Sequence, residues 1–331
     1  MMEKVAFLTG GTGFIGIHLV SELLRRNFHL YLLIRNEEKA RSRFSNIEKG
    51  EKITFLKGTI FDIEEYSKEI EKSSYFFHLA ALTKALRKED FFEVNVKGTQ
   101  KVLEVLKNIE TKNLRFIHIS SLAALGPSKT YGYPEFMGPV STYGISKLES
   151  EKVIKDHLPT KMYTIIRPPA VFGPFDTDVY KFFKSVKNGI VPLIGFKEKL
   201  VSIVYVKDLV RGIVDSAISE NTGGKEYCLA YEKFFTWKEL GKIASSILNK
   251  RVLYLRIPHF MVLTSGALNG FFTRLSGKID IFDLEKAKEI TKNYWICDVK
   301  NAKKDFNFSC RYSIEKAFEE TIKWYQDENL L

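Results

Sequence analysis

The 331-residue sequence predicts an α/β fold, in which helices cover both faces of a doubly wound parallel sheet. Through the first two thirds of the chain, short runs of β-branched and aromatic residues alternate with stretches of helical periodicity. The strand-like runs are apolar almost throughout, as is typical of parallel strands buried on both faces. After Arg167 the alternation breaks down at a cluster of prolines and glycines. We therefore expect a smaller, interleaved and mostly helical C-terminal domain.

The elements of the sheet are expected in regular succession along the chain. The expected strands are Val5–Thr9, Leu30–Ile34, Ile53–Lys57, Tyr75–Leu79, Arg115–Ser120 and Tyr163–Arg167. Between them, the expected helices are Gly13–Arg26, Ile63–Ile70, Val94–Leu106 and Tyr143–Asp156. Because crossovers between parallel strands are right-handed by default, this succession predicts a doubly wound sheet.

After Arg167 the chain is expected to leave the sheet and then to return to it. The strand ends at the segment that contains Pro168, Pro169, Gly173 and Pro174. One further strand and helix, Val201–Val206 and Asp208–Ser219, are expected to rejoin the sheet. The chain from Arg251 onwards is predicted to be mostly helical, with a last helix from Ser313 to about Tyr325.

The composition is that of an ordinary globular protein, with 45% apolar and 27% charged residues. Cys228, Cys297 and Cys310 are too few and too scattered for a disulfide framework or a metal site, so free thiols in a reducing compartment are expected. The six histidines show no metal-ligand spacing, and no catalytic metal is expected. The net charge of +11 is spread along the chain, which favours a lysine-rich solvated surface over nucleic-acid binding.

No targeting segment is recognisable, and we expect a cytoplasmic protein. The longest apolar stretch, Ile257–Phe272, falls short of the ~20 residues that span a bilayer. Membrane contact is therefore not expected, although an interfacial position for this stretch stays open as an alternative.

A glycine-rich segment, Thr9-Gly10-Gly11-Thr12-Gly13-Phe14-Ile15-Gly16, lies between the first expected strand and the first expected helix. Gly10 permits a tight turn, Gly13 lets the backbone approach a pyrophosphate, and Gly16 allows close packing of the helix. The helix N-terminus then presents unpaired N–H groups and a positive dipole end to the anion. The segment therefore predicts a dinucleotide site.

The end of the second expected strand indicates which dinucleotide binds. An acidic residue there accepts hydrogen bonds from a ribose 2′-hydroxyl, whereas an arginine accommodates a 2′-phosphate. This sequence has Arg35, with Lys39 close behind, and a guanidinium suits phosphate in charge and in geometry. We predict NADP(H) in preference to NAD(H), although Glu37 and Glu38 nearby leave the second possibility open.

Tyr143 and Lys147 stand four residues apart at the start of an expected helix and therefore share one face. An ammonium beside a phenol favours the phenolate, so the pKa of Tyr143 is expected to move from ~10 towards neutrality. Ser120 and Ser121 end an expected strand, at the edge of the sheet where ligands bind. A hydroxyl there can hold a substrate carbonyl while Tyr143 transfers a proton.

These features and three others resemble the motifs of the extended short-chain dehydrogenases/reductases, in the NAD-dependent epimerase/dehydratase superfamily, over nearly the full chain. The other motifs are His78-Leu79-Ala80-Ala81, Asn95-Val96-Lys97-Gly98-Thr99 and Arg167-Pro168-Pro169-Ala170-Val171-Phe172-Gly173-Pro174. The resemblance implies that Tyr143 is the acid/base and that Lys147 binds the nicotinamide ribose. It also implies that Ser121, or else Ser120, polarises the substrate.

The resemblance further implies a cofactor site along the sheet edge and a second domain that binds substrate. Residues Leu79, Ala80 and Ala81 would pass beneath the cofactor, Ile60 would contact the adenine, and Pro168 would lie beside the nicotinamide. Asn95 would have a structural or a proton-relay role, and a homodimer is implied. Residues 1–171 would form the Rossmann domain, with 201–230 rejoining its sheet, and residues 172–200 and 231–331 the substrate domain.

Departures from the family pattern narrow the expected reaction. Relatives that dehydrate nucleotide sugars carry an Asp-Glu pair where this chain has Leu122-Ala123. The segment Ser202–Leu209 lacks the arginine of sugar-nucleotide enzymes, although Arg251, Arg256 or Arg274 could replace it. Without these dehydratase and sugar-nucleotide features, the sequence resembles the branch of 3β-hydroxysteroid dehydrogenases and dihydroflavonol reductases. Members of that branch act on carbonyls or secondary alcohols of apolar skeletons.

The expected function is therefore an NADP(H)-dependent oxidoreductase for an apolar small molecule. Val179–Phe183 and Ile257–Phe272 would wall its pocket or simply form core helices. An NAD-dependent sugar-nucleotide epimerase that uses the same residues is the first alternative. A non-enzymatic redox sensor is the second alternative, against which the presence of Ser121, Tyr143 and Lys147 argues.

Overall fold

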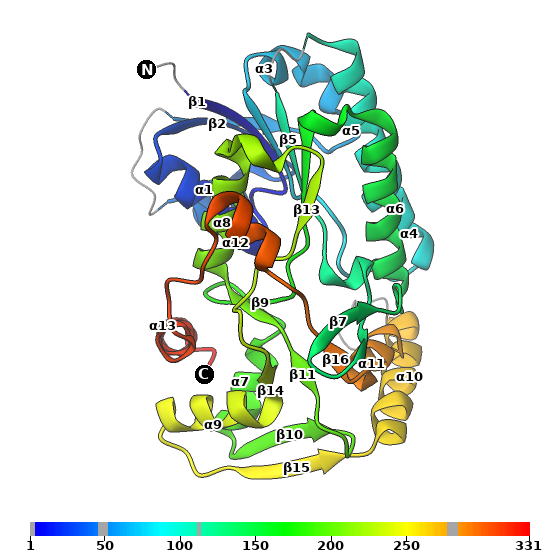
Figure 1. Cartoon of the computed structure of the whole chain (residues 1–331), viewed down its shortest axis with the longest axis vertical. Helices are drawn as coiled ribbons and strands as arrows, with labels where there is room; N and C mark the ends of the chain where they lie inside the picture. The colour runs from blue at the N-terminus through cyan, green and yellow to red at the C-terminus, as the bar shows by residue number, and fades with distance from the viewer. Residues whose placement is uncertain (1–3, 46–51, 111–113, 277–283) are drawn as a thin grey trace.

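The computed structural model describes residues 4–45, 52–110, 114–276 and 284–331. Its centre is a seven-stranded sheet in the order β13-β8-β5-β4-β1-β2-β3, and all neighbouring strands are parallel (Figure 1). The strands are β1 (Lys4–Thr9), β2 (Phe28–Ile34), β3 (Ile53–Lys57), β4 (Tyr75–His78), β5 (Arg115–Ile119), β8 (Tyr163–Ile166) and β13 (Lys225–Tyr227). The first six match the expected strands closely, and the predicted doubly wound sheet is confirmed.

Helices lie on both faces of the sheet. One face carries α1 (Phe14–Arg25) and α8 (Val206–Ile218), and the other carries α5 (Gly98–Asn108) and α6 (Thr142–His157) (Figure 1). The shorter helices of this part are α2 (Glu37–Arg43), α3 (Ser67–Glu71), α4 (Lys88–Phe92) and α12 (Lys300–Phe306). The single turns are η1 (Ile63–Tyr66), η2 (Glu93–Lys97, a π turn), η3 (Leu122–Ala124), η4 (Thr160–Met162) and η5 (Glu220–Thr222). The strand order reverses between β1 and β4, which is where a doubly wound sheet binds ligands.

The second domain is interleaved and contains helices together with small sheets. Its helices are α7 (Tyr180–Lys187), α9 (Trp237–Ile247), α10 (His259–Ser276), α11 (Leu284–Thr291) and α13 (Ile314–Asp327). A mixed sheet joins β14 (Phe235–Thr236), β11 (Leu200–Val201), β16 (Tyr294–Trp295), β6 (Ser128–Thr130) and β7 (Tyr133–Phe136). Two parallel pairs join β10 (Ile190–Ile194) to β15 (Leu253–Ile257) and β9 (Ala170–Phe172) to β12 (Ile203–Tyr205). The last helix, α13, begins after the cap residue Ser313, which confirms the predicted start.

The expected strand Val201–Val206 does not rejoin the large sheet, and that prediction is wrong. The expected strand is interrupted at Ser202, and the segments before and after it pair with different strands. The N–H of Ser202 donates to Trp295 O, and its Oγ accepts from Cys297 N. Val201 therefore pairs in the mixed sheet, and Ile203–Tyr205 pairs with β9. The expected helix follows as α8, and β13 after it takes the sheet edge beside β8.

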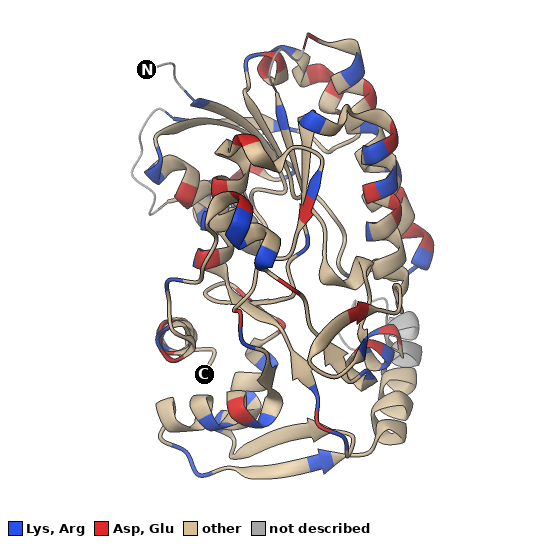
Figure 2. Ribbon diagram, viewed as in Figure 1, with Lys and Arg blue, Asp and Glu red and all other residues tan. Residues whose placement is uncertain are grey.

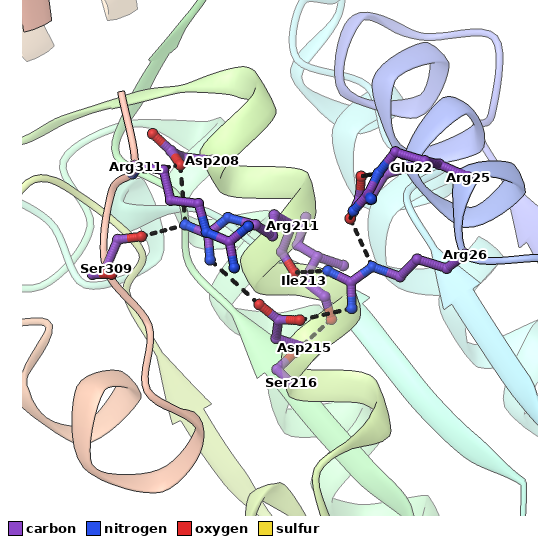
Figure 3. Close-up of polar contacts among 10 residues, drawn as sticks. All are labelled: Glu22, Arg25, Arg26, Asp208, Arg211, Ile213, Asp215, Ser216, Ser309 and Arg311. Atoms are coloured by element: carbon purple, nitrogen blue, oxygen red, sulfur yellow. Dashed lines mark hydrogen bonds and ion pairs between the residues drawn. The ribbon is translucent and has the colours of Figure 1, made fainter. Parts of the chain in front are cut away.

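A polar network fastens α8 to its neighbours, as Figure 3 shows. Arg26 pairs with Glu22 of α1 at 2.6 Å and with Asp215 of α8 at 2.7 Å. Arg211 pairs with the fully buried Asp208 at 3.0 Å and donates to the carbonyl of Ser309. These bonds hold the C-terminal segment against the first domain. The apolar core on this face likewise runs on into the second domain without interruption.

The basic residues are dispersed over the molecule (Figure 2), and the three cysteines, all within the described ranges, form no disulfide. Lysines and arginines are spread over both domains rather than gathered in one stripe (Figure 2). The three cysteines are free thiols, with Cys228 and Cys297 buried and Cys310 half-buried. Within the described ranges, no cluster of three His, Cys, Asp or Glu side chains could hold a metal ion.

Candidate active site

The glycine-rich loop between β1 and α1 packs tightly against the segment that follows β4. Gly10 has φ +75°, and a Cβ there would lie 2.7 Å from backbone atoms of Leu79 and Ala80. A Cβ on Gly16 would overlap the backbone of Gly10 and Gly11. Gly13 is exposed, and a Cβ there would meet only Gly10 O, at 3.3 Å. The loop is thus closed on its inner side and open above Gly13.

The N-terminus of α1 is built to receive an anion. Its cap residue, Gly13, makes no side-chain cap bond, and the first turn, from Phe14 through Ile15 and Gly16, holds no acidic residue. Its leading N–H groups and positive dipole end therefore face the open side of the loop. Arg43 of α2 donates to the carbonyl of Thr12 and holds the loop from outside. These residues fit the pyrophosphate of a dinucleotide, and sequence reasoning had missed Arg43.

Arg35 lies directly after β2, at the same edge of the sheet. It is exposed and forms no ion pair within the part of the chain that the structure describes. Glu37 pairs with Arg41 at 2.6 Å, so its charge is already compensated. Asn36 caps α2 by accepting from the N–H of Lys39. The nearest acidic residue that could oppose a 2′-phosphate is thereby partly neutralised.

The segment after β4 is held by buried hydrogen bonds beside the loop. Leu79, Ala80 and Ala81 are half-buried, and the N–H groups of Leu79 and Ala80 donate to Thr9. His78 hydrogen-bonds to Thr9 Oγ1 at 2.8 Å and to Thr99 Oγ1 at 3.0 Å. Burial lowers the pKa of His78 to about 3, so the ring is neutral. His78 therefore has a structural role: it holds Thr9 and Thr99 at the edge of the sheet where the cofactor is expected to bind.

Asn95 connects the same segment to α6. Its side chain accepts from the N–H of Leu82 at 2.7 Å and donates to Leu82 O at 3.0 Å and to Ser146 Oγ at 2.9 Å. It stands in the π turn η2, and such turns are frequent at functional sites. The expected helix Val94–Leu106 therefore begins with this wider turn.

Ile60 and Pro168 lie at the same edge but turn their side chains into the protein. The Ile60 side chain is buried, and its tip would overlap a Cβ on Gly98 of α5, so that only its backbone could meet an adenine. Pro168 is buried after β8, and its carbonyl accepts from the N–H of Leu122 at 2.9 Å.

Ser121 and Tyr143 meet directly. Ser121 caps η3 by accepting from the N–H of Ala123 at 3.1 Å, and its hydroxyl lies close enough to the Tyr143 phenol to exert a lowering effect on the pKa of Tyr143. Gly144 permits this approach, because a Cβ there would overlap the carbonyl of Ala123. Ser120, the other candidate, instead donates to the buried carboxylate of Glu151. The structure therefore places Ser121, and not Ser120, beside the phenol.

Lys147 lies one turn along α6 and is buried. Its Nζ donates to Ile119 O at 2.8 Å and lies 3.4 Å from His118 Nε2. Burial lowers the pKa of Lys147 to about 8, against the opposing effect of Glu151.

The expected lowering of the Tyr143 pKa does not occur, and that prediction is wrong. Burial raises the pKa to about 12, and the charge of Glu289 acts in the same direction, whereas the Ser121 hydroxyl opposes both. Across the described ranges no hydrogen bond joins Lys147 to Tyr143, because the amino group is held by the end of β5. The phenol therefore keeps its proton at neutral pH.

A buried ion pair behind the site was not anticipated from the sequence. Glu151 is fully buried and pairs with Arg167, whose Nε lies 2.9 Å from Glu151 Oε1. Arg167 also pairs with Glu226 of β13 at 2.5 Å. Glu151 stands four residues after Lys147, and this helical spacing is the signal that could have revealed it.

Two carboxylates of α11 fasten the first turn of α6. Glu285 accepts from Thr142 N at 2.8 Å and from Thr142 Oγ1 at 3.0 Å. Glu289 accepts from Ser141 Oγ at 2.5 Å. Acceptors at a helix N-terminus satisfy free N–H groups and the positive end of the dipole. The second domain thus holds the turn that carries Tyr143, over a sequence separation that no local pattern reveals.

The two apolar stretches that were expected to wall a pocket differ in their burial. Val179–Phe183 belongs to the core: Phe183 is fully buried, Phe182 packs on Trp237, and Tyr180 packs on Tyr325. In Ile257–Phe272, Val262 is buried, whereas Phe260 is largely exposed. Residues 270–272 lie outside the described side chains.

Comparison with known proteins agrees with this geometry. Residues 6–229 match the model of the NAD dependent epimerase/dehydratase family. The chain is 27% identical over 323 residues to a ceramide reductase of Caulobacter vibrioides, covering 97% of this chain and 94% of that protein. It is 24% identical over 339 residues to the decarboxylating sterol-4-alpha-carboxylate 3-dehydrogenase of Mus musculus, covering 97% and 90%.

Among solved structures, a UDP-glucuronic acid 4-epimerase from Bacillus cereus in complex with UDP-glucuronic acid and NAD superposes with a TM-score of 0.75. The identity is 19%, and the match covers 98% of this chain and 99% of that chain, which supports the fold alone. The family match covers most of the chain, including the phosphate loop and the Ser121–Tyr143 pair. The protein belongs to the NAD-dependent epimerase/dehydratase family.

Proposed function

We propose that the protein is an NADP(H)-dependent oxidoreductase that interconverts a carbonyl and a secondary alcohol on a largely apolar substrate. The convergence of Ser121 and Tyr143, at the sheet edge onto which the phosphate loop opens, carries this proposal. The bound nicotinamide would supply or accept the hydride. Family members include reductases and dehydrogenases, which supports an enzymatic role.

The three side chains have distinct parts in the proposed reaction. Tyr143, with its raised pKa, is protonated at neutral pH and donates its proton to the substrate oxygen. The Ser121 hydroxyl donates a hydrogen bond to the same oxygen and stabilises the negative charge that develops there. Lys147, protonated at neutral pH, stabilises the phenolate that Tyr143 becomes and offers N–H donors to the cofactor ribose.

The cofactor preference follows from Arg35. NADPH is expected to bind at least ~10-fold more tightly than NADH, because a hydrogen bond to a charged group contributes about 1.5–3 kcal/mol. Arg35→Ala should remove most of this preference. The control is Lys107→Ala, which removes an exposed cation on α5. The test compares the dissociation constants of NADPH and NADH, measured by fluorescence titration. Equal or NADH-favouring values would contradict the prediction.

Activity should depend on pH through Lys147. Its ammonium loses its proton as the pH rises through about 8, so kcat/KM for carbonyl reduction should fall above that pH. The contribution of Lys147 to the free energy of unfolding should instead increase with pH. The folded pKa lies below the ordinary 10.5, so the unfolded chain binds more protons from about pH 8 to 10.5, and this group makes the free energy of unfolding rise there. A flat activity profile, or activity lost only in parallel with stability, would argue against this role.

An apolar substrate is favoured over a sugar nucleotide. Leu122 and Ala123 are buried apolar residues where a dehydratase carries acidic ones. Arg256, one possible substitute for the missing pyrophosphate-binding arginine, donates to the carbonyls of Gly195 and Phe196. Two of the relatives act, by their names, on a ceramide and on a sterol.

A spectrophotometric screen of NADPH oxidation tests the proposal. The panel contains ketones on sterol and long-chain lipid skeletons, flavonoid ketones, simple aldehydes and sugar nucleotides. Steady NADPH consumption with an apolar ketone is the expected result. Interconversion of sugar-nucleotide epimers without net cofactor consumption, by protein purified with NAD attached, would show the epimerase alternative instead.

A further inference from the structure

The end of the second domain farthest from the sheet exposes several large apolar side chains. We call these residues the tip surface: Leu253 and Leu255 on β15, Phe196 after β10, and Phe260 and Met261 at the start of α10. The exposed fractions of Phe196, Leu253 and Phe260 are 72%, 67% and 66%. Figure 1 shows β10, β15 and the start of α10 together at the lower end of the molecule. Contiguous exposed apolar surface of this kind marks an interaction site.

The β10–β15 pair has one face inside and one outside. Val191 is fully buried, and a Cβ on Gly241 of α9 would lie 2.6 Å from it. Ile190 stands opposite Leu253, and Pro192 stands opposite Leu255. Because strand side chains alternate between faces, Ile190, Leu253 and Leu255 share the outer face. That face is aliphatic, and no element of the described chain covers its exposed residues.

The loop after β10 and the first turn of α10 lie together at the end of this strand pair. Arg256 Nη1 donates to Phe196 O at 2.9 Å and to Gly195 O at 3.2 Å, which fixes the loop beside β15. A Cβ on Gly195 would overlap the ring of His259, the first residue of α10. Phe196 therefore lies next to the turn that presents Phe260.

Most charges around the tip surface are positive, although the exposed Glu198 stands next to Lys197. Residues 240–276 contain no Asp or Glu, and the sequence has none from 179 to 197. Lys197, Lys250 and Arg251 are exposed, and over the described ranges none of the three is in an ion pair. Figure 2 shows basic residues on the loop that enters β15 and on β15 itself. An occupant that complements this surface is apolar and negatively charged.

The start of α10 suits contact with lipid. Residues 257–273 include no Asp, Glu, Lys or Arg. The hydroxyl of Thr264, on the exposed side of the helix, donates to Phe260 O at 2.9 Å, so it needs no partner from water. Within the described chain, no helix has both the length and the apolar character to cross a bilayer. The start of α10 thus turns Phe260 and Met261 outward on a segment that carries no charged side chain.

We propose that the tip surface docks on an anionic phospholipid bilayer, with its apolar side chains in the headgroup region and its lysines and arginines on the lipid phosphates. This differs from the expectation from sequence alone, because the outward direction of these side chains is not visible in the sequence. The docked face would also be close to the site, since α10 packs on α11, which fastens the first turn of α6. The proposal stands independently of the oxidoreductase activity.

Vesicle flotation of the full-length chain tests the proposal. One set of vesicles is pure phosphatidylcholine, and the other contains about 30% phosphatidylserine. The protein is expected to float with the anionic vesicles and to be released by high salt, because exposed charges are screened. The measurement needs no substrate or cofactor, so its failure leaves the proposed function untouched.

Two double variants separate the apolar and the charged contributions. Phe260→Ser/Met261→Ser and Lys250→Glu/Arg251→Glu are each expected to reduce partitioning at least ~10-fold. All four side chains are exposed, so the fold should persist. The apolar control is Tyr133→Ser, which is also 66% exposed but lies on β7. The charge control, Lys72→Glu/Lys107→Glu, makes the same change in net charge on exposed residues of the first domain.

The outcomes decide between the possible occupants. Equal losses in the control variants, or no flotation with anionic vesicles, would overturn the proposal. If Phe260→Ser/Met261→Ser turns a dimer into a monomer in light scattering and leaves flotation unchanged, the tip surface is an interface with a second copy instead.

Discussion

Tyr143→Phe is expected to reduce the rate of carbonyl reduction at least ~10²-fold and to leave NADPH binding intact, because general acid catalysis contributes about that much. The change removes the hydroxyl that meets Ser121 and retains the ring, which packs on Phe91 with centroids 6.1 Å apart. The fold and the cofactor edge should therefore be preserved. Steady-state kcat and the dissociation constant of NADPH are the two measurements.

The chain offers a matched control for the loss of a tyrosine hydroxyl. The hydroxyl of Tyr231 is buried and has no hydrogen-bond partner among the described residues. Tyr231→Phe should therefore leave kcat unchanged. Turnover that survives in Tyr143→Phe would show that the substrate proton comes from another group.

Glu151→Ala is expected to lower the free energy of unfolding by about 3–5 kcal/mol, the largest stability effect that we predict. Glu151 is fully buried, accepts from Ser120 and compensates Arg167, so its removal leaves a buried guanidinium without its main partner. Urea unfolding measures the change. Glu232→Ala, which breaks the exposed pair with Lys303, should cost no more than ~1 kcal/mol.

The Glu151–Arg167 ion pair can also be removed as a whole. Replacing both residues, as Glu151→Leu/Arg167→Met, should be less harmful than Glu151→Ala, because no buried charge is left unpaired and Glu226, the other partner of Arg167, keeps its ion pair with Lys155. A Glu151→Ala variant as stable as Glu232→Ala would show that the pair contributes little.

Short-range patterns in the sequence were enough to predict the large sheet, its covering helices and the phosphate loop. Strand and helix periodicity predicted the large sheet and its covering helices, because each element must bury an apolar face whatever its partner is. The phosphate loop was also predictable from the sequence. Gly10, Gly13 and Gly16 are required there because the backbone turns and packs closely within a few residues. The four-residue spacing of Tyr143 and Lys147, which puts both on one helix face, belongs to the same class.

Which groups meet, and which are buried, became visible in the folded chain. The tertiary structure directed Ser120 to Glu151 and Ser121 to Tyr143, and it brought Glu285 and Glu289 to the first turn of α6. It also raised the pKa of Tyr143 instead of lowering it. Desolvation and long-range pairing depend on which surfaces come together. Residue type and local spacing do not contain that information, whereas they do contain the period of a helix or the turn that a glycine permits.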